Sequence, residues 1–323
     1  MKLSIIIPVY NSERFLAKCL ESVCIQDLPN SEYEIIIIND GSSDGSAKII
    51  EDFQGKYSNV IGIKQENKGV SAARNAGLEI GKGAFVTFVD SDDRITVNSL
   101  QDILAYIDQY DLDILYTEIE TIDEAGKHIS YFPATGKQNE IKDGFSHPRR
   151  TYTPTFYRRN LLQDIRFNKS IAIGEDTVFN AKVQAFAKRV SQIDIPYYKY
   201  MVRENSLTKQ GHSSKAFHGF VKAIEDIRNF QHENFNENPE AQPFFDQVYE
   251  TFVTRIIELN IIPTWNKFHY LELVELLNKE CLSYILDLFS IKYPYVNKSY
   301  FQFMHYQKYL NLKSRIYNLI HRA

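Results

Sequence analysis

Short, almost uninterrupted apolar runs recur through the first half of the chain, and they constrain its fold more than any other feature. Residues 3–7, 34–38 and 84–89 consist mainly of isoleucine, leucine, valine and phenylalanine. Such runs are too short for ordinary helices, and they lack the alternation of a strand with one face in water. They are typical of strands buried on both faces of a parallel sheet. A further strand is expected near residues 60–64, and Pro8 is expected to break the first strand.

Amphipathic segments follow these strands and complete an α/β pattern. Ser12 is placed to cap a helix that carries apolar residues on one side, namely Phe15, Leu16, Cys19, Leu20 and Val23. A second helix is expected to be capped near Asp44, and a third is expected over residues 69–80. This alternation of strand and helix predicts a parallel, doubly wound sheet.

The pattern loosens after about residue 111. The elements expected there are strands over 113–121 and 127–132, a helix over 175–189 and an extended segment over 192–202. Residues 134–160 are rich in Pro, Gly, Arg and Thr and are predicted to form an irregular insertion that faces the substrate. From about residue 214 the pattern is helical. We therefore expect an α/β domain over residues 1–214 and a helical C-terminal extension over residues 215–323.

The composition argues against several classes of protein. The net charge of −4 is too near neutral for a general nucleic-acid binder. The three cysteines form no CxxC pair, which favours a reducing, cytosolic compartment. No apolar run approaches the ~20 residues that cross a bilayer. The chain has no P-loop, no glycine-rich dinucleotide motif and no HExxH pattern, so the sequence does not support the function of an ATPase, a dehydrogenase or a zinc hydrolase.

Polar residues stand where each expected strand ends. They occupy positions 8–11, 39–45, 67–69 and 90–93. The C-terminal ends of parallel strands meet at one edge of a sheet, and ligands of α/β proteins bind at that edge. One such strand end by itself is more often a simple turn. Four of them at the same edge predict a ligand site.

Residues 90–93, Asp-Ser-Asp-Asp, are the most informative of these segments. Like charges this close are unfavourable unless a cation offsets them, and carboxylate oxygens suit Mg²⁺ or Mn²⁺. A divalent ion at Asp90 and Asp92 would hold a diphosphate and stabilise it as a leaving group. The alternative is a solvated turn in which Asp93 or Thr96 starts the next helix.

Three further polar residues suit a nucleotide. Lys68 and Arg74 lie at and within the first turns of the third helix, whose N-terminus attracts phosphate. Asp40 can accept a hydrogen bond from a base N–H. The alternatives are a pair of solvated surface cations and, for Asp40, a turn-forming Asp-Gly pair with Gly41.

Taken together, these blocks resemble the family 2 glycosyltransferases of GT-A fold. The resemblance covers about residues 1–210 and is carried by residues 4–11, 39–44, 67–75, 90–93, 174–179 and 203–208. It implies a Rossmann-like, mostly parallel sheet flanked by helices. It also implies transfer of a sugar, with inversion, from a nucleotide diphosphate sugar that is usually UDP-linked.

The same resemblance assigns roles by position. Asp176 matches the catalytic base, and Asp90 and Asp92 match the family's DxD pair, with Asp92 the more direct ligand of Mn²⁺ or Mg²⁺. The remaining donor contacts would be Pro8, Val9, Tyr10 and Asp40 around the nucleoside, and Lys68 and Arg74 near the ribose and phosphates. Inversion by single displacement independently requires a group that removes the acceptor proton. Without the other blocks, the pair Glu175-Asp176 would be read as an acidic first helical turn.

We therefore expect a metal-dependent hexosyl- or N-acetylhexosaminyltransferase. Its acceptor would be a hydroxyl of a glycan or lipid-linked molecule in bacterial cell-surface polysaccharide synthesis, an expectation that rests on family analogy. The main alternative is a non-catalytic protein that binds a nucleotide sugar or a glycan, although a binder needs no base at Asp176. A nucleotidyltransferase is a weaker alternative, because residues 8–12 lack a glycine-rich, basic phosphate loop. His212 is read as a solvated loop histidine, with a metal-ligand role as the alternative.

The C-terminal tail, residues 288–323, combines six Lys or Arg with many aromatic residues and contains no Asp or Glu. A basic, aromatic, amphipathic segment can lie on an anionic membrane surface, which would place the enzyme at the inner face of the cell membrane. It can equally pack its aromatic residues inside the protein or in a homodimer interface and expose its cations. Both interpretations stay open at this stage. Nucleic-acid binding by the tail is disfavoured, because nothing else in the sequence indicates it.

Overall fold

The computed structural model describes residues 1–132, 140–145, 154–202, 214–257 and 267–279. The chain divides into two compact units, Met1–Lys169 with Glu175–Ser206 and Ser170–Gly174 with Leu207–Ala323. Three predictions fall outside the described residues: the tail over 288–323, His212 and the block over 203–208.

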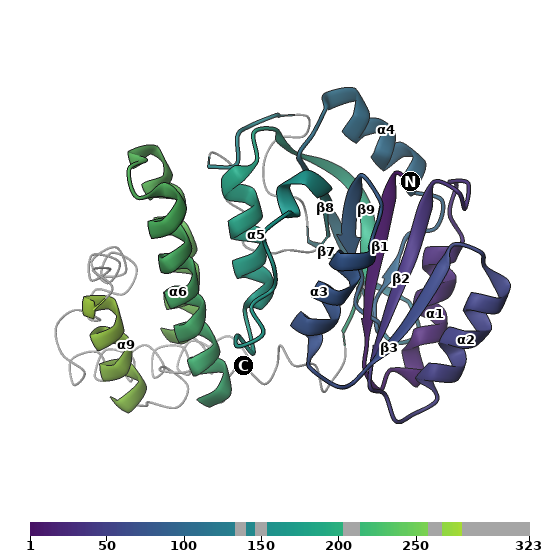
Figure 1. The fold of residues 1–323 in the computed structure, drawn as a ribbon, viewed down its shortest axis with the longest axis horizontal. Helices are drawn as coiled ribbons and strands as arrows, with labels where there is room; N and C mark the ends of the chain where they lie inside the picture. The colour runs from purple at the N-terminus through teal and green to yellow at the C-terminus, as the bar shows by residue number, and fades with distance from the viewer. Residues whose placement is uncertain (133–139, 146–153, 203–213, 258–266, 280–323) are drawn as a thin grey trace, which may run out of the picture. The chain divides into compact units, whose positions relative to one another are not determined.

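The N-terminal half of the sheet is parallel, as the apolar runs predict. Its strands lie in the order β3-β2-β1-β4 (Figure 1), with bounds β1 Leu3–Val9, β2 Tyr33–Asp40, β3 Val60–Gln65 and β4 Phe85–Phe88. In register, Ile5 of β1 pairs with Ile35 of β2 and with Thr87 of β4. The polar residues that follow these strands therefore share one edge of the sheet.

Pro8 does not break the first strand, contrary to the expectation from sequence. Strand β1 continues through Pro8, which pairs with Ile38, to Val9. The backbone oxygen of Ile6 accepts from the N–H of Val89 on the β4 side, so Pro8, two residues on, turns its nitrogen to the same side. The pairing of β1 with β4 ends at Ile6 and Phe88. The missing N–H of Pro8 therefore leaves no hydrogen bond of the sheet unmade.

Beyond β4 the sheet is mixed rather than parallel. The order continues β8-β6-β9-β5, with β7 paired to β6. The bounds are β5 Arg94–Ile95, β6 Ile114–Ile122, β7 His128–Phe132, β8 Thr155–Arg158 and β9 Val190–Met201. The expected strands around the turn at Gly126 and the extended segment after residue 190 are confirmed. The prediction that residues 134–160 are irregular is wrong for β8, which lies antiparallel between β4 and β6.

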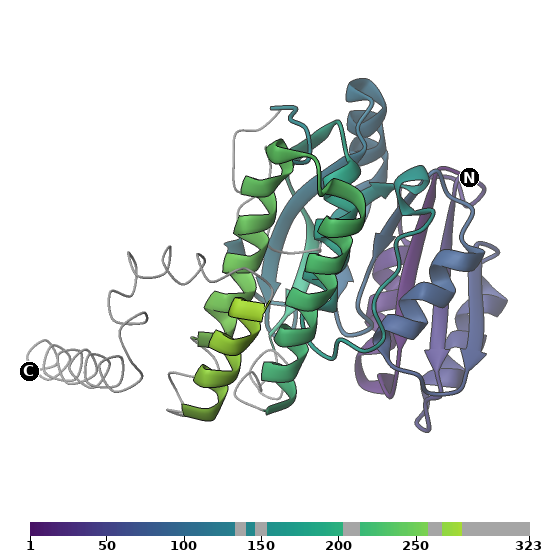
Figure 2. The same cartoon turned by 60° about the vertical axis from the view of Figure 1, so that its left-hand side comes forward.

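Helices cover both faces of the sheet (Figures 1 and 2). Alternate residues of each strand point to opposite faces and pack against different helices. The helices of this unit are α1 Glu13–Cys24, α2 Ser46–Lys56, α3 Val70–Ile80, α4 Leu100–Tyr110 and α5 Glu175–Phe186. Odd-numbered residues such as Ile5 and Ile35 belong to the core that includes α1, α2 and α4. Even-numbered residues such as Ile6 and Ile36 belong to the core that includes α3 and α5. Burial on both sides explains why these strands are continuously apolar.

Ser12 is the N-cap residue of α1, as expected, whereas the N-cap residue of α2 is Gly45, next to the expected Asp44, and neither N-cap residue makes a side-chain capping bond. Ser12 occupies the position before α1, yet its hydroxyl lies 2.7 Å from that of Ser91 and makes no capping bond. Asp44 accepts from the backbone N–H of Ser46, at the start of α2, at 3.0 Å. It also accepts from the N–H of Glu13 at 3.0 Å and so ties the starts of both helices together.

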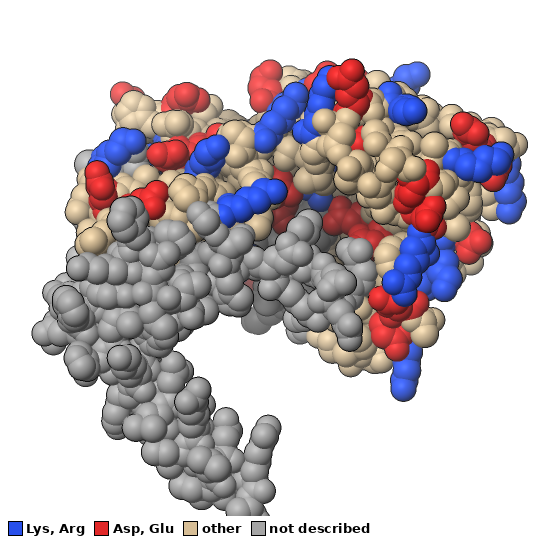
Figure 3. Space-filling view, turned by 90° about the horizontal axis from the view of Figure 1, so that it is seen from below, with Lys and Arg blue, Asp and Glu red and all other residues tan. Residues whose placement is uncertain are grey.

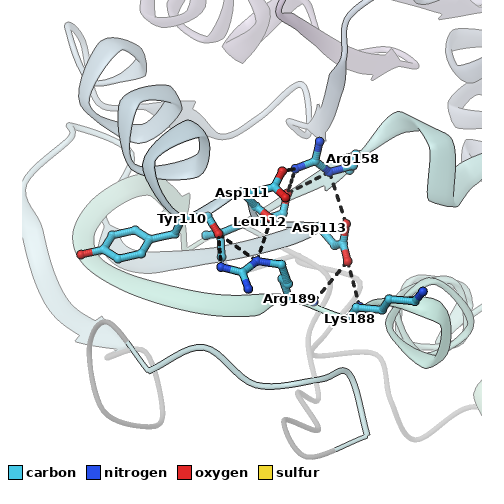
Figure 4. A network of polar contacts seen from close by, with 7 residues as sticks. All are labelled: Tyr110, Asp111, Leu112, Asp113, Arg158, Lys188 and Arg189. Carbon is cyan, nitrogen blue, oxygen red and sulfur yellow. Dashed lines mark hydrogen bonds and ion pairs between the residues drawn. The ribbon is translucent and has the colours of Figure 1, made fainter.

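A polar network fixes the edge of the sheet opposite the acidic segment (Figure 4). Arg158 ends β8 beside Phe85, the first residue of β4. Its guanidinium pairs with Asp111 at 2.7 Å and with Asp113 at 3.2 Å. The other carboxylate oxygen of Asp113 accepts from the backbone N–H groups of Lys188 and Arg189 at 2.8 and 3.1 Å. This network joins the starts of β4, β6 and β9 and lies away from the predicted site.

The second unit is helical in its described part, as the sequence pattern predicts. Its helices are α6 Ser214–Phe235, α7 Gln242–Ile256 and α9 Lys267–Lys279. Phe220 of α6 and Phe252 of α7 are buried, with ring centroids 6.3 Å apart. Among the described residues, no helix is both long and apolar enough to cross a membrane. On the face seen in Figure 3, cationic and anionic side chains are interspersed over the described surface.

Candidate functional site

The acidic segment after β4 is folded into a tight turn. The N–H of Asp93 donates to the backbone oxygen of Asp90 at 3.0 Å, and the hydroxyl of Ser91 lies against that of Ser12. Asp90 and Asp92 stay partly exposed, whereas Asp93 is buried. The alternative that Asp93 or Thr96 starts the next helix is wrong, because β5 follows at once and α4 begins only at Leu100.

Asp93 anchors this turn to strand β9. Its carboxylate accepts from the hydroxyl of Tyr198 at 2.8 Å and from the backbone N–H of Met201 at 2.8 Å. The oxygen of Tyr198 also accepts from the N–H of Asp90 at 3.2 Å. Burial, reinforced by Asp92 and Asp90, raises the pKa of Asp93 well above its ordinary value. Strand β9, which is distant in the sequence, thus holds the backbone of the acidic segment in place.

Arg74 on α3 lies directly beside the acidic segment. It is 3% exposed, and its Nη2 lies 2.9 Å from Oδ1 of Asp90. Its Nη1 lies 3.0 Å from Oε1 of Glu175, the first residue of α5. The guanidinium carbon stands 5.2 Å from the centroid of the Phe167 ring, within cation–π range. Arg74 therefore bridges two carboxylates from segments that are far apart in sequence.

Asp176, the predicted base, follows Glu175 in the first turn of α5. It is partly exposed, and its Oδ1 accepts from the backbone N–H of Thr177 at 2.6 Å. Burial and the neighbouring Asp176 raise the pKa of Glu175 to about 7, against the opposing effect of Arg74. The bridge through Arg74 thus brings the first turn of α5 to the acidic segment after β4. The two segments predicted to carry the chemistry therefore lie next to each other.

The nucleoside-side residues form a second cluster, at the ends of β1, β2 and β3. Asp40 is 3% exposed. Its carboxylate accepts from the side-chain amide of Gln65 at 2.7 Å and from the backbone N–H groups of Lys68 and Gly69 at 2.9 and 2.8 Å. Asp40 therefore shapes the loop between β3 and α3. Its expected contact with a base stays a prediction.

The other predicted donor contacts differ in exposure. Pro8 and Val9 are buried within β1, whereas the side chain of Tyr10 is 52% exposed. Lys68 is exposed at the start of α3, and this position leaves its ammonium open to a phosphate. The N-cap residue of α3 is Gly69, with a φ of 87°, a conformation that few other residues adopt.

Several residues of this site were not predicted from sequence. Glu175 was read only as part of an acidic turn, and Tyr198, Asn180 and Phe167 were not singled out at all. Asn180 is fully buried on α5, one turn after Asp176, and its Oδ1 accepts from the hydroxyl of Tyr157 at 3.0 Å. A polar residue in the middle of an expected helix, four positions from a carboxylate, is the signal that could have found Asn180.

The donor set at the acidic turn fits a small divalent cation. Among the residues the structure describes, no group of three or more His, Cys, Asp or Glu side chains is arranged to hold a metal ion. Mg²⁺ is usually held by one or two carboxylates together with substrate phosphates and water. Asp92 and Asp90, both partly exposed, provide such a pair. The remaining ligands would then come from the donor diphosphate.

A mixed α/β sheet whose parallel strands end in acidic and amide-bearing loops is typical of α/β proteins that bind a ligand at the carboxyl edge of the sheet. The chain belongs to glycosyl transferase family 2, whose family model matches residues 4–166. The family expected from the sequence blocks is therefore confirmed.

Individual relatives agree with this assignment. The chain is 32% identical over 240 residues to the glycosyltransferase GlyA of Streptococcus pneumoniae. This match covers 70% of the present chain and 34% of GlyA. It is 32% identical over 260 residues to the poly(ribitol-phosphate) beta-N-acetylglucosaminyltransferase TarS of Staphylococcus aureus. This match covers 79% of the present chain and 44% of TarS. The chain thus spans less than half the length of these curated relatives.

A solved structure confirms the fold. The crystal structure of residues 1–349 of S. aureus TarS in complex with UDP-GlcNAc matches with a TM-score of 0.70 and 26% identity. The match covers 88% of this chain and 81% of that one. The expected GT-A fold, a sheet flanked by helices with further helices toward the C-terminus, is therefore confirmed.

Proposed function

We propose that the protein is an inverting glycosyltransferase that moves a sugar from a UDP-linked donor to a hydroxyl of a cell-surface glycan or lipid-linked acceptor. The observation that carries the proposal is the bridge through Arg74. It places the acidic segment, at Asp90, beside the first turn of α5, which bears Asp176. A single displacement needs both parts at once, a site for the departing diphosphate and a base for the incoming hydroxyl.

In this mechanism Asp176 is the catalytic base. The acceptor oxygen forms a bond to the anomeric carbon of the sugar as the bond from that carbon to the diphosphate oxygen breaks. The acceptor proton passes to the carboxylate of Asp176, and the electron pair of the broken bond leaves with UDP. The exposure of Asp176 at the start of α5 leaves room for an acceptor hydroxyl.

The donor side of the proposal uses the residues at the ends of the parallel strands. Asp92 and Asp90 would hold Mn²⁺ or Mg²⁺, which supplies positive charge that stabilises the departing diphosphate when bound. Lys68 would contact a phosphate near the start of α3, where the helix dipole favours negative charge. Tyr10, Pro8, Val9 and the loop shaped by Asp40 would surround the nucleoside.

The relatives guide the choice of substrates to test. S. aureus TarS is named as a transferase of N-acetylglucosamine to poly(ribitol-phosphate), and a crystal structure of its first 349 residues holds UDP-GlcNAc. A Bacillus spizizenii relative, 33% identical, is named as a poly(ribitol-phosphate) beta-glucosyltransferase. These names support UDP-hexoses and UDP-N-acetylhexosamines as donors and polyol-phosphate or glycan polymers as acceptors.

A donor screen tests the proposed reaction. The full chain is incubated with Mn²⁺ and a panel of UDP-, GDP- and dTDP-sugars, with and without acceptor polymers. We expect UDP release with a UDP-sugar and a product whose anomeric linkage is inverted relative to the donor. Tight UDP binding without transfer or hydrolysis of any donor would favour the non-catalytic binder instead. Preference for a GDP- or dTDP-sugar would overturn the assignment of uridine to the loop at Asp40.

The division into a catalytic domain over residues 1–214 and a helical extension over 215–323 belongs to the same proposal. We assign the basic tail over 288–323 to contact with the anionic inner face of the membrane or with a lipid-linked acceptor. Sedimentation of the full chain with anionic liposomes at low and high salt tests this role, because salt screens such attraction. A chain that stays in the supernatant at both salts would favour packing of the tail within the protein or a homodimer.

A further inference from the structure

Arg74 is a buried cation with carboxylate partners on two separate elements. Its guanidinium contacts Asp90 at 2.9 Å and Glu175 at 3.0 Å. The side chain of Glu175 is 13% exposed, and that of Arg74 is 4% exposed. A planar guanidinium can address two carboxylates at once in a fixed geometry, which a single ammonium cannot do. The three side chains therefore set the distance between the end of β4 and the start of α5.

We propose that Arg74 and Glu175 are positioning residues, which hold the first turn of α5, and with it Asp176, at a fixed place relative to the acidic segment at Asp90. The inference rests on the proposed function, in which these two segments handle the acceptor proton and the donor diphosphate. It gives Arg74 a role different from the phosphate contact expected from sequence. It also gives a role to Glu175, to which the sequence pattern assigned none.

A bridge of this kind is a poor device for stability alone. Removing two or three charges from water is costly, and well-packed apolar residues in their place are often equally or more stable. The bridge does, however, specify one relative position of its partners. A base must lie within hydrogen-bond reach of the hydroxyl that it deprotonates, and a displacement of ~1 Å can cost ~10²-fold in rate. Positioning is therefore the role that these buried charges suit best.

The rest of α5 is held independently of the bridge. The side chain of Asn180, one turn after Asp176, accepts from the hydroxyl of Tyr157 at 3.0 Å. The next residue on that face, Gln184, accepts from Tyr116 at 2.8 Å. These contacts anchor the helix to β8 and β6. Loss of the bridge should therefore free the first turn without releasing the helix.

The test uses the full chain at about pH 8, above the pKa of Glu175 of about 7, and the substitution Glu175→Gln, which keeps the size of the side chain and removes its charge. Asp113→Asn is the matched control, because it removes one carboxylate from the partly buried pair with Arg158 at the opposite edge of the sheet. For each protein, UDP affinity is measured by calorimetry with Mn²⁺, and kcat and KM are measured with the best donor. Arg74→Lys and the double variant complete a cycle.

We expect Glu175→Gln to bind UDP within about twofold of the unmodified protein and to lose about tenfold or more in kcat with little change in donor KM. The control should keep kcat within about twofold. The double variant should fall no further than the worse single variant, because residues that act as a unit are not additive. If the contact of Glu175 only stabilised the protein and had no positioning role, Glu175→Gln and Asp113→Asn would lose kcat equally.

Three results would overturn the inference. The first is a kcat for Glu175→Gln within about twofold of the unmodified protein. The second is an equal kcat loss in Asp113→Asn. The third is a large rise in donor KM for Arg74→Lys without one for Glu175→Gln, which would make Arg74 a donor contact. If Arg74→Lys does not fold, Arg74→Gln takes its place in the cycle. A chain that transfers no sugar at all overturns the proposed function, and the positioning roles with it.

Discussion

Glu175→Gln should make the protein more stable at neutral and alkaline pH, although it slows the reaction. Burial beside Asp176 raises the pKa of Glu175 from 4.5 to about 7. Between these two values the unfolded chain has released the proton of Glu175, while the folded chain retains it. The folded state then binds more protons than the unfolded state, so its stability falls as pH rises. Above about pH 7 the loss is complete.

The size of the effect follows from the same shift. One unit of pKa corresponds to ~1.4 kcal/mol, so a rise from 4.5 to about 7 corresponds to ~3 kcal/mol as an upper figure. Glutamine resembles the protonated acid and does not titrate. The two proteins should therefore be about equally stable near pH 4, below both pKa values, and the variant should be more stable by ~1–3 kcal/mol near pH 8.

Urea denaturation of both proteins at a series of pH values measures this difference directly. All groups that titrate alike in both proteins, including Asp93, cancel when the two free energies of unfolding are subtracted. We expect the difference to grow in favour of the variant by up to ~1.4 kcal/mol for each unit of pH between 4.5 and about 7. A difference that stays constant, or one that favours the unmodified protein more strongly as pH rises, would refute the reasoning.

Three further predictions concern the proposed chemistry and the packing beneath it. Asp176→Asn should retain UDP binding and lose transfer, because an amide cannot take the acceptor proton; near-normal turnover would show that the base lies elsewhere. Asp92→Ala should weaken Mn²⁺-dependent UDP binding in calorimetry and leave metal-free binding unchanged. Gly77→Ala should lower the thermal midpoint, since its new methyl would clash with the side chain of buried Ile6, whereas Gly55→Ala, with open space around it, should raise stability by up to ~1 kcal/mol.

The parallel half of the sheet was predictable because its signal is local. Each apolar run is long enough to mark a strand and carries no alternation, so burial on both faces follows from the run itself. The helices between the strands follow from the spacing of their apolar residues. Pro8 was misjudged because its effect depends on where the neighbouring strand β4 ends, which no local pattern reveals.

The mixed half could not be predicted in the same way. Strand β8 contains only residues Thr155–Arg158, and its neighbours are β4 and β6, which lie far from it in the sequence. Such a strand is defined by its partners rather than by its own composition. The candidate site shows the same difference between local signals and contacts that depend on the fold. Asp90 and Arg74 were singled out by residue type and position, and Asp176 by the family resemblance, but the pairing of Arg74 with Glu175, 101 residues away, needed the fold.

The sheet order has a consequence for how the chain folds during synthesis. The strands up to β4 pair among themselves, but the acidic segment that follows is anchored by Tyr198, which lies 105 residues beyond Asp93. A ribosome needs roughly 5 to 20 s to add that many residues. For the first part of this interval, until residues 155–158 are made, a parallel sheet formed by β1 to β4 would lack β8 at its β4 edge, and such an open edge invites pairing with other chains. Slow translation between residues 93 and 158 should therefore raise the demand for chaperones, before any helix of the second unit is made.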